Sequence, residues 1–276
     1  MLYLCATPIG NLGDVSRRCI ETLEGVDLIA AEDTRHTLKL LNHFGIQKLM
    51  TSYHEHNKKE KGEYLLGLLR EGKNIALVSD AGTPAISDPG EDLVKLCIEN
   101  DIDVTSIPGP VAGINALILS GFSTKRFAFE GFLPVQKKLK REHLESVKND
   151  AHTLIFYEAP HKLITTLSDM HDVFGDRKIA LVRELTKLHE EVFRTTLLEA
   201  LEYYKENQPR GEYVIVVSGT DKTDEKADDE WWSLLSVVDH VDEYIKRGKT
   251  TKDAIKEVAG DRKLPKRDVY NEYHKE

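Results

Sequence analysis

Short apolar segments alternate with stretches of helical periodicity through the first 122 residues, and this alternation restricts the fold more than any other feature of the sequence. The segments that we predict as strands are LYLCAT, DLIAAED, KLMTSY, NIALVSD and DVTSIPG. The predicted helices cover residues 16–24, 34–44, 59–71, 91–99 and 111–119. Strands that alternate with helices form a largely parallel sheet with the helices packed on it. We therefore predict an α/β domain over residues 1–122.

Three of these predicted strands end in loops of small residues. The longest loop is SDAGTPAISDPG, residues 79–90, and the others are PIGNLGD at 8–14 and SIPGPVAG at 106–113. Glycine tolerates positive φ and proline fixes φ, so a rigid backbone can approach a ligand closely here. Ligands of open α/β sheets bind beyond the carboxyl ends of the strands. We expect a small-molecule pocket at this edge. The alternative for residues 79–90 is an ordinary connection, although such connections usually have about 2–6 residues.

Residues 123–220 form a second block of strands and helices. The predicted strands are FAFEGFLP, TLIFYEAPHK, KIALVREL, HEEVFRTT and EYVIVVSG, and the predicted helices lie at residues 137–147, 163–174 and 197–206. A helix follows HEEVFRTT so closely that we expect a mixed rather than a wholly parallel sheet. The sequence thus predicts a second α/β domain over residues 123–220, with a ligand cleft between the two domains.

The composition changes after residue 220. Residues 221–229 are acidic and polar, and we interpret them as an exposed linker. Residues 230–276 contain three short helical patterns, which indicate a small module similar to a helix-turn-helix. Residues 221–243 hold nine acidic and two basic residues, a net charge of −7, whereas residues 244–276 hold ten basic and six acidic residues, a net charge of +4. The module either contacts RNA or is a bundle that only packs on its neighbour.

Charge, cysteine content and hydropathy argue against several classes of protein. The net charge of −9 argues against a general nucleic-acid coat protein, because nonspecific affinity comes from neutralising phosphates. The three cysteines lack the paired spacing of a zinc site and fit a reducing cytosol, so we expect a cytoplasmic protein without a bound metal. The longest mostly apolar run, residues 111–122, is too short to span a membrane, and Met1 leads into an apolar strand without the basic region of a secretory signal.

Eight motifs identify a family resemblance that extends over roughly the whole chain. They are PIGNLGD (8–14), AAEDTRHT (30–37), SYHEH (52–56), SDAGTPAISDPG (79–90), SIPGP (106–110), FEGFLP (129–134), FYEAPHK (156–162) and RELTKLHEE (183–191). In content and order they resemble the bacterial small-subunit ribosomal RNA methyltransferase I family, which belongs to the tetrapyrrole methylase superfamily. The chain departs from the family pattern at Val111, where a serine generally follows the PGP turn.

The resemblance implies a reaction, a fold and a cofactor site. The reaction is transfer of the methyl group of S-adenosylmethionine to the ribose 2′-oxygen of a cytidine in the decoding region of 16S rRNA. The implied fold is two α/β domains with the cofactor in the cleft between them, and the implied assembly is a homodimer. By matched motif, the methionine and sugar parts are expected to contact Asp80, Gly82, Thr83, Ala85 and Ile86. The adenine end is expected to meet Pro8, Ala112, Gly113, Tyr157, Glu158 and Leu185.

Methyl transfer from a sulfonium is an in-line displacement, so alignment of the oxygen with the methyl carbon is the main requirement. A ribose hydroxyl is a poor nucleophile near neutral pH and needs a proton acceptor or a group that stabilises negative charge. Arg35 is our candidate for a phosphate or oxyanion contact, and a salt bridge to Glu32 or Asp33 is its alternative role. The other catalytic candidates are Glu158, Glu184 and Lys187. The sequence does not identify which group is the base.

The candidate RNA contacts are aromatic, histidine and basic side chains. Tyr53 is placed to stack on a base, with buried packing as the equal alternative, and His54 is a candidate substrate contact. We do not expect His54 and His56 to bind a metal, because the sequence offers no third and fourth ligand. The basic candidates, besides Arg35, are Lys137, Lys138, Lys140, Arg141, Lys266 and Arg267.

Two further functions stay open at this stage. One keeps the superfamily and changes the acceptor to a tetrapyrrole carbon, since a porphyrinogen that carries carboxylates is also an anion. The other is a ribosome-binding factor without catalysis, although such a protein has no need of the loop at residues 79–90. A nucleotide phosphotransferase is disfavoured because the chain lacks the G-x-x-x-x-G-K-[ST] loop. The sequence also leaves open whether the acceptor is free 16S rRNA or the assembled small subunit.

Overall fold

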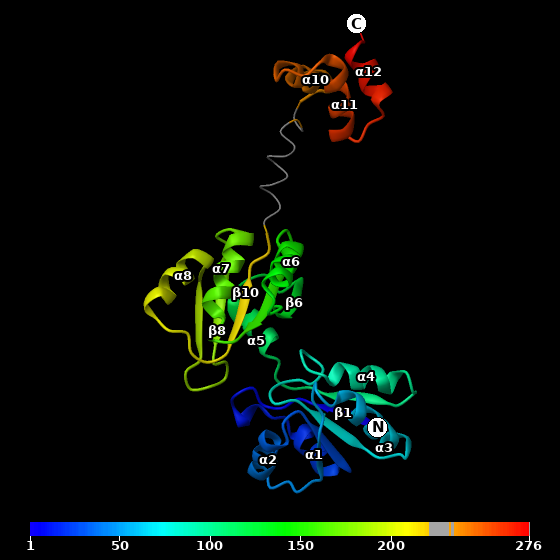
Figure 1. Cartoon of the computed structure of the whole chain (residues 1–276), viewed down its shortest axis with the longest axis vertical. Helices are drawn as coiled ribbons and strands as arrows, with labels where there is room; N and C mark the ends of the chain where they lie inside the picture. Colours follow the sequence, from blue (N-terminus) through cyan, green and yellow to red (C-terminus); the bar gives the residue numbers. More distant parts are fainter. Residues whose placement is uncertain (221–231, 233–234, 276) are drawn as a thin grey trace. The chain divides into compact units, whose positions relative to one another are not determined.

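The chain divides into two compact units, residues 1–220 and 221–276 (Figure 1). The computed structural model describes residues 1–220, 232 and 235–275. The predicted acidic linker at 221–229 lies outside the described residues, as do residues 230, 231, 233 and 234 of the predicted module. In the part of the chain that is described, no helix has the length and apolar character needed to cross a membrane.

The first half of unit 1 contains a five-stranded sheet in the order β3-β2-β4-β1-β5, and every strand pair in it is parallel. The strands are β1 (Leu2–Cys5), β2 (Leu28–Ala31), β3 (Met50–Ser52), β4 (Ile75–Val78) and β5 (Val104–Ile107). All five predicted strands are present, each shorter than its apolar segment. Because the strands are parallel, the loops that follow β1, β2 and β4 leave the sheet at the same edge.

Helices cover both faces of this sheet. The helices are α1 (Arg17–Gly25), α2 (Thr34–His43), α3 (Lys58–Arg70) and α4 (Gly90–Ile98), and a 3₁₀ turn, η1 (Leu12–Asp14), precedes α1. Cys19, Leu23 and Leu41 pack with strand residues in one core, whereas Leu65 and Leu93 pack in a second core on the other face. Successive strand residues point to opposite faces, so continuous apolar strands serve both cores.

The second half of unit 1 contains a five-stranded sheet in the order β6-β7-β10-β8-β9. Its strands are β6 (Phe127–Phe132), β7 (Thr153–Glu158), β8 (Lys178–Arg183), β9 (Glu191–Thr196) and β10 (Tyr213–Val217). Strands β6 and β7 are parallel and the other neighbours are antiparallel, which confirms the predicted mixed sheet. A bulge between Phe129 and Gly131 interrupts the register of edge strand β6.

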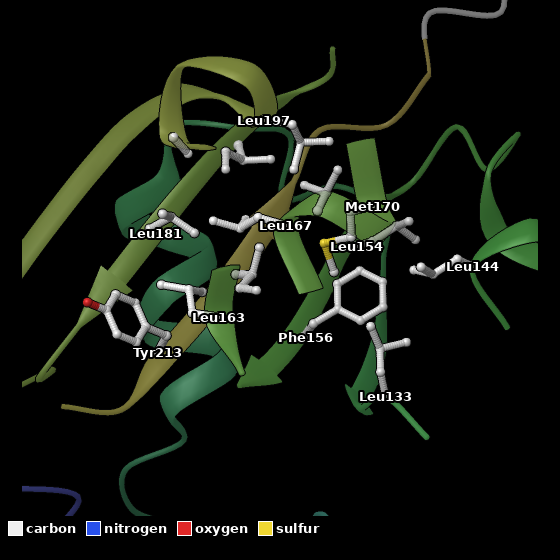
Figure 2. Packing of buried hydrophobic residues seen from close by; sticks show 14 of the residues in the cluster. Leu133, Leu144, Leu154, Phe156, Leu163, Leu167, Met170, Leu181, Leu197 and Tyr213 are labelled. Carbon is white, nitrogen blue, oxygen red and sulfur yellow. The ribbon is translucent and has the colours of Figure 1, made fainter. Parts of the chain in front are cut away.

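One face of this second sheet is covered by α6 (Lys137–Val147), α7 (Leu163–Phe174) and α8 (Leu197–Glu206). Figure 2 shows the core on this face, where Phe156, Leu167 and Met170 are fully buried. The other face is covered by α5 (Ala112–Ser120), whose Ala116 and Leu117 pack against strand residues of this sheet. Helix α5 therefore lies within the predicted domain 1–122 but packs on the second sheet, and the predicted boundary at residue 122 stays a prediction.

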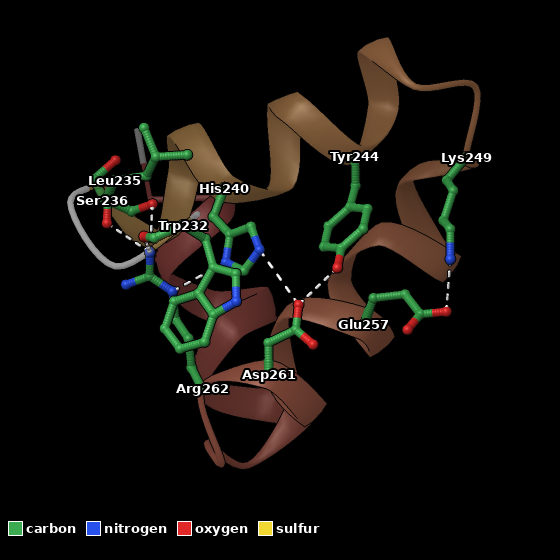
Figure 3. A network of polar contacts seen from close by, with 9 residues as sticks. All are labelled: Trp232, Leu235, Ser236, His240, Tyr244, Lys249, Glu257, Asp261 and Arg262. Atoms are coloured by element: carbon green, nitrogen blue, oxygen red, sulfur yellow. Dashed lines mark hydrogen bonds and ion pairs between the residues drawn. The ribbon is translucent and has the colours of Figure 1, made fainter. Parts of the chain in front are cut away.

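The described part of unit 2 contains α10 (Val237–Lys246), α11 (Thr251–Asp261) and α12 (Lys266–Tyr273). Their apolar faces meet around Val241, Val258 and Val269. Figure 3 shows the polar network beside this core, in which Arg262 Nε donates a hydrogen bond to Nδ1 of the buried His240. The three helical patterns predicted in this region are thus present in the described residues.

Candidate active site in unit 1

A cavity of about 540 Å³ lies in unit 1 and is lined by residues from both of its halves. The lining side chains of the first half come from the loops after β1, β2, β4 and β5, and those of the second half come from the ends of β6, β7, β8 and β10 with the loops beside them. Those from the first half are Ile9, Glu32, Ser79, Asp80, Ala81, Gly82, Thr83, Ile86, Ser87, Asp88, Val111 and Ala112. Those from the second half are Phe132, Tyr157, Glu158, Ala159, Pro160, Val182, Glu184, Leu185, Lys187, Glu212, Tyr213 and Val214.

The loop after β4 is held in a fixed shape by Asp88. Its Oδ1 accepts hydrogen bonds from the backbone N–H groups of Ala85, at 3.0 Å, and Gly90, at 2.8 Å. Ala85 and Ser87 both have positive φ, at 69° and 64°, a conformation that is strained for residues with a side chain. Strain of this kind concentrates at ligand sites, where the surrounding structure holds it in place.

The same loop is joined to the loops after β1 and β5. Thr7 and Gly82 exchange two backbone hydrogen bonds, at 2.8 and 3.1 Å, and Gly82 has a φ of 83°. The hydroxyl of Thr83 donates to the carbonyl of Pro110 at 3.0 Å. The three loops of small residues that the sequence singles out therefore form one connected wall of the cavity.

Glu32 and Asp80 form a pair on this wall; Asp80 is a predicted cofactor contact, whereas Glu32 is predicted only as an alternative salt-bridge partner of Arg35. The backbone N–H of Asp80 donates to Glu32 Oε2 at 3.3 Å, and the backbone N–H of Asp33 donates to Asp80 Oδ1 at 3.0 Å. Burial, with the nearby charges of Asp80 and Asp88, raises the pKa of Glu32 above its ordinary value. Its place directly after β2, at the edge where the small-residue loops gather, is the sequence signal by which Glu32 could have been found.

Tyr157 connects the second sheet to the start of α5. Its hydroxyl oxygen accepts a hydrogen bond of 2.9 Å from the backbone N–H of Gly113. The rings of Phe129 and Phe132 stand edge-on to Tyr157, with centroids 5.0 and 5.5 Å away. Burial raises the pKa of Tyr157, so this hydroxyl stays protonated near neutral pH.

Glu158 has both carboxylate oxygens occupied. Oε1 accepts from the backbone N–H of Ala159 at 2.9 Å, and Oε2 accepts from the Thr166 hydroxyl at 2.6 Å. Lys140 Nζ donates to the Thr166 hydroxyl and also lies 2.8 Å from Asp169 Oδ2. Glu158 is only 6% exposed, and the hydrogen bonds from Ala159 and Thr166 fix its orientation on the cavity wall.

Glu184 and Lys187 form an ion pair at the cavity. Lys187 Nζ lies 2.9 Å from Glu184 Oε1, and this hydrogen bond lowers the pKa of Glu184. Burial disfavours the charge of Lys187, but its hydrogen bonds and the charges of Glu184 and Glu212 outweigh burial and raise its pKa. The loop that carries them has positive φ at Glu184 and Thr186. A Cβ at Gly10 would lie 2.5 Å from Lys187 Cγ, so the first loop packs directly against this one.

Most residues predicted to hold the cofactor line this cavity. Those that do are Asp80, Gly82, Thr83, Ile86, Ala112, Tyr157, Glu158 and Leu185, together with the catalytic candidates Glu184 and Lys187. Pro8, Ala85 and Gly113 do not line it. Ala85 and Gly113 contribute through their backbone N–H groups, which bind Asp88 and Tyr157.

Arg35 does not line the cavity and forms the salt bridge that the sequence left open as its alternative. Its Nη2 lies 2.7 Å from Asp33 Oδ2, and its Nε donates to Oδ1 of the same carboxylate at 3.1 Å. Hydrogen bonds from Arg35 hold the pKa of Asp33 well below its usual range. The Arg35 side chain is nevertheless 89% exposed, so its outer face stays accessible to an anion.

Two of the predicted RNA contacts have to be revised. Tyr53 is only 2% exposed and donates its hydroxyl hydrogen to the carbonyl of Pro89, so its ring packs in the core and is not available to stack on a base. Lys140 is 12% exposed and is held by Thr166 and Asp169, because its long stem crosses from α6 to α7.

His54, the histidine among the predicted RNA contacts, is partly buried, and its Nε2 lies 3.3 Å from Asn57 Nδ2.

The remaining basic candidates are exposed: Lys137, Lys138, Arg141, Lys266 and Arg267. Lys138 and Arg141 lie on α6 at 3.8 and 3.9 Å from glutamates one turn on, which are weak surface pairs. The described residues contain no group of three or more histidine, cysteine, aspartate or glutamate side chains arranged to hold a metal ion.

The lining suits an organic ligand with an apolar ring and polar or cationic groups. Ile9, Ile86, Leu185 and Val214 offer apolar surface, whereas Glu32 and Asp80 offer carboxylates. Small-molecule sites usually have volumes of about 300–1,000 Å³ and combine apolar walls with a few polar groups. The cavity has this character.

A family model and curated proteins from several bacteria match this chain and identify the same family of methyltransferases. Residues 1–201 match the family model described as Tetrapyrrole (Corrin/Porphyrin) Methylases. The chain is 54% identical over 275 residues to Ribosomal RNA small subunit methyltransferase I of Halalkalibacterium halodurans, covering 100% of this chain and 95% of that protein. It is 49% identical over 274 residues to the protein of the same name from Bacillus subtilis, covering 99% of this chain and 94% of that protein.

Solved structures share the fold at low sequence identity. A diphthine synthase superposes with a TM-score of 0.64 at 13% identity, over 79% of this chain and 89% of the other. The uroporphyrin-III-C-methyltransferase of Thermus thermophilus superposes with a TM-score of 0.55 at 18% identity, over 79% and 93%. These similarities confirm the predicted fold and carry no argument about the substrate.

Proposed function

The chain belongs to the tetrapyrrole methylases and, within them, to the ribosomal RNA small subunit methyltransferase I family, and we propose that it methylates the ribose 2′-oxygen of a cytidine in the decoding region of 16S rRNA. Its methyl donor is S-adenosylmethionine. Family membership supports the class of acceptor, ribosomal RNA. The nucleotide and the atom are the part that we propose.

One observation carries the proposal. Six of the eight motifs of the resemblance, which are spread over residues 8–191, each contribute at least one residue to the same cavity of about 540 Å³. Examples are Ile9, Glu32, Phe132 and Lys187, which come from four different motifs. Distant motifs that converge on one concave surface indicate a shared ligand, because packing alone does not require them to surround an open space.

The lining residues fit S-adenosylmethionine. The apolar side chains of Ile9, Ile86 and Leu185 suit the adenine ring, and the carboxylate of Asp80 suits ribose hydroxyls and positive charge. When bound, the cofactor supplies an electrophilic methyl group on a positively charged sulfur. The protein then has to exclude water and hold the acceptor oxygen in line with that methyl carbon.

Contacts to the RNA backbone are proposed for exposed basic side chains. In unit 1 these are Arg35 at the start of α2 and Lys137, Lys138 and Arg141 on α6; in unit 2 they are Lys266 and Arg267 on α12. Each phosphate contact adds affinity that depends on salt and not on base sequence. These contacts allow an acidic protein, of net charge −9, to bind a polyanion locally.

We also propose that the protein is a homodimer that acts in the cytoplasm on the small ribosomal subunit. Edge strand β6 and the segment after it expose Phe127, Phe132 and Val135, with 42%, 59% and 83% of their surface accessible. An exposed apolar edge strand is a ready pairing surface. Light scattering distinguishes a dimer from a monomer.

The proposal is tested by transfer of labelled methyl from S-adenosylmethionine to small subunits that lack the modification, followed by digestion to nucleosides. Label in 2′-O-methylcytidine is the expected result. Label in a base, or in another nucleoside, would overturn the proposed acceptor atom or nucleotide. No label, together with measured cofactor binding, would direct the search to free 16S rRNA and then to tetrapyrroles.

A further inference from the structure

Several carboxylates line the cavity. They differ in how many hydrogen bonds each already accepts, and therefore in how readily each can accept a proton from a substrate. Both oxygens of Glu158 are occupied, by Ala159 and Thr166. Glu184 is paired with Lys187, and the same Oε1 also accepts from the backbone N–H of Glu212 at 3.1 Å. An ion-paired carboxylate with a lowered pKa is a weak base.

The two aspartates of the β4 loop have structural tasks. Asp88 Oδ1 accepts from two backbone N–H groups and shapes the loop. Asp80 Oδ1 accepts from the backbone N–H of Asp33 and thereby joins this loop to the end of β2. The hydrogen bonds of both side chains to the backbone therefore hold this wall of the cavity in place.

Glu32 is the least constrained of these side chains. It follows β2 directly and lines the cavity, and it accepts one hydrogen bond, from Asp80 N to Oε2. At 3.3 Å this bond is longer than any accepted by Glu158, Glu184, Asp88 or Asp80. Its Oε1 forms no hydrogen bond or ion pair within the described residues. The backbone holds the side chain in place while one oxygen stays available.

We propose that Glu32 is the catalytic base that accepts the proton of the acceptor hydroxyl. This inference rests on the proposed function. In the step, the ribose oxygen forms a bond to the methyl carbon, the carbon–sulfur bond breaks with its electron pair on sulfur, and the hydroxyl proton passes to Glu32 Oε1. A carboxylate and a sulfonium become a carboxylic acid and a neutral thioether, so charge and atoms balance.

The charged groups around Glu32 suit this task. Burial disfavours its negative charge and the charges of Asp80 and Asp88 repel it, whereas the hydrogen bond from the Asp80 backbone and the charge of His54 act in the opposite direction; the net result is a raised pKa of Glu32. A base works best when its pKa approaches the working pH. Arg35, three residues further along and 89% exposed, offers an adjacent contact for an RNA phosphate.

The test compares Glu32→Gln with Glu63→Gln, a control that removes the same charge from an exposed position on α3. Single-turnover methyl transfer and the affinity for S-adenosylhomocysteine are measured for both. We expect Glu32→Gln to reduce the rate at saturating substrate by about 100-fold or more with unchanged affinity, and Glu63→Gln to change neither. Glu32→Asp should retain part of the rate and the rise of rate with pH, which Glu32→Gln should lose.

A measurement without turnover completes the test. The pKa of Glu32 is read by carbon NMR of ¹³C-glutamate-labelled protein, with Glu32→Gln to assign the signal, and is expected above the ordinary glutamate range. An ordinary pKa, a wild-type rate in Glu32→Gln, or loss of S-adenosylhomocysteine binding in that variant would each overturn the assignment. If wild type and Glu32→Gln both transfer the methyl group at the same rate, the proposed function stands and Glu32 is not the base. If wild type transfers no methyl group, both the proposed function and the role of Glu32 are wrong.

Discussion

The hydroxyl oxygen of Tyr157, at the end of β7, accepts a hydrogen bond of 2.9 Å from the backbone N–H of Gly113, in the first turn of α5. The first N–H groups of a helix have no partner within the helix, so the tyrosine satisfies one of them. This bond places the N-terminus of α5 and the loop before it beside the cavity. It links the small-residue loop at 106–113 to the FYEAPHK motif, which lies more than 40 residues further along the chain.

Replacement of Tyr157 by phenylalanine should weaken both stability and cofactor binding. The change leaves a half-buried N–H without its acceptor, which costs about 1–3 kcal/mol. We expect a lower urea midpoint of unfolding and a higher dissociation constant for S-adenosylmethionine. Tyr203→Phe is the control, because that side chain is exposed and does not line the cavity. Equal effects of the two changes would contradict a role for the Gly113 hydrogen bond.

Gly90→Ala should disrupt the loop after β4. A Cβ at this position would lie 2.7 Å from Asp88 Oδ1, 2.9 Å from the backbone nitrogen of Ala85 and 3.0 Å from Leu77 Cδ2. Because two of these atoms belong to the hydrogen bonds that shape the loop, relief of the clash must move the loop. Overpacking of this kind costs about 1–3 kcal/mol, and we expect calorimetry to show much weaker cofactor binding.

Gly67→Ala provides the matched control for that change. Gly67 lies on α3 and an added Cβ there would meet nothing within 4 Å. The substitution should be neutral or stabilise the protein by about 0.5–1 kcal/mol, since alanine favours the helix. Intact cofactor binding in Gly90→Ala would show that the loop does not need its present shape.

Lys187→Met should alter the acid sensitivity of the protein. Lys187 holds the pKa of Glu184 below its ordinary value, so the pair stabilises the fold above the unfolded pKa of glutamate, about 4.3, and this contribution is lost as pH falls through the folded pKa. The pair is partly exposed, so we expect the variant to be less stable by about 1 kcal/mol or less at pH 7. The difference should shrink below pH ~4, as measured by urea unfolding at several pH values. A difference that is constant with pH would assign the effect to lost packing.

Lys140→Met and Lys138→Met should have opposite consequences, although both remove a lysine from α6. Lys140 is partly buried and bound to Thr166 and Asp169, so its loss should destabilise the protein by about 1.5–3 kcal/mol. Lys138 is 86% exposed, so its loss should leave stability unchanged and reduce rRNA affinity. If Lys138 contacts a phosphate, the slope of log affinity against log salt should fall by about one. Equal loss of stability in the two variants would contradict this division.

Local structure and family membership can be predicted from this sequence alone. Apolar segments of 3–6 residues formed strands, and Ser16 and Thr250 cap helices at the positions that their neighbours indicate, because caps and periodicity depend on residues close in the chain. The glycines, prolines and aspartates of residues 79–90 predict a loop beside a ligand pocket, and this loop lines the cavity. The eight motifs predict the family, which the comparisons confirm.

Which of the candidate side chains are available to a ligand depends on contacts between distant residues. From the sequence, Lys140 is a candidate RNA contact and Tyr53 is equally a stacking or a packing residue. In the fold, Asp169 and Pro89, which lie 29 and 36 residues away, bind the polar ends of these side chains. Glu32 and Asp80, 48 residues apart, meet because β2 and β4 are neighbours in the first sheet. Helix α5 packs on the second sheet although it follows the last strand of the first. Burial and pairing depend on residues brought together by the fold, and a pattern along the chain carries no direct record of those contacts.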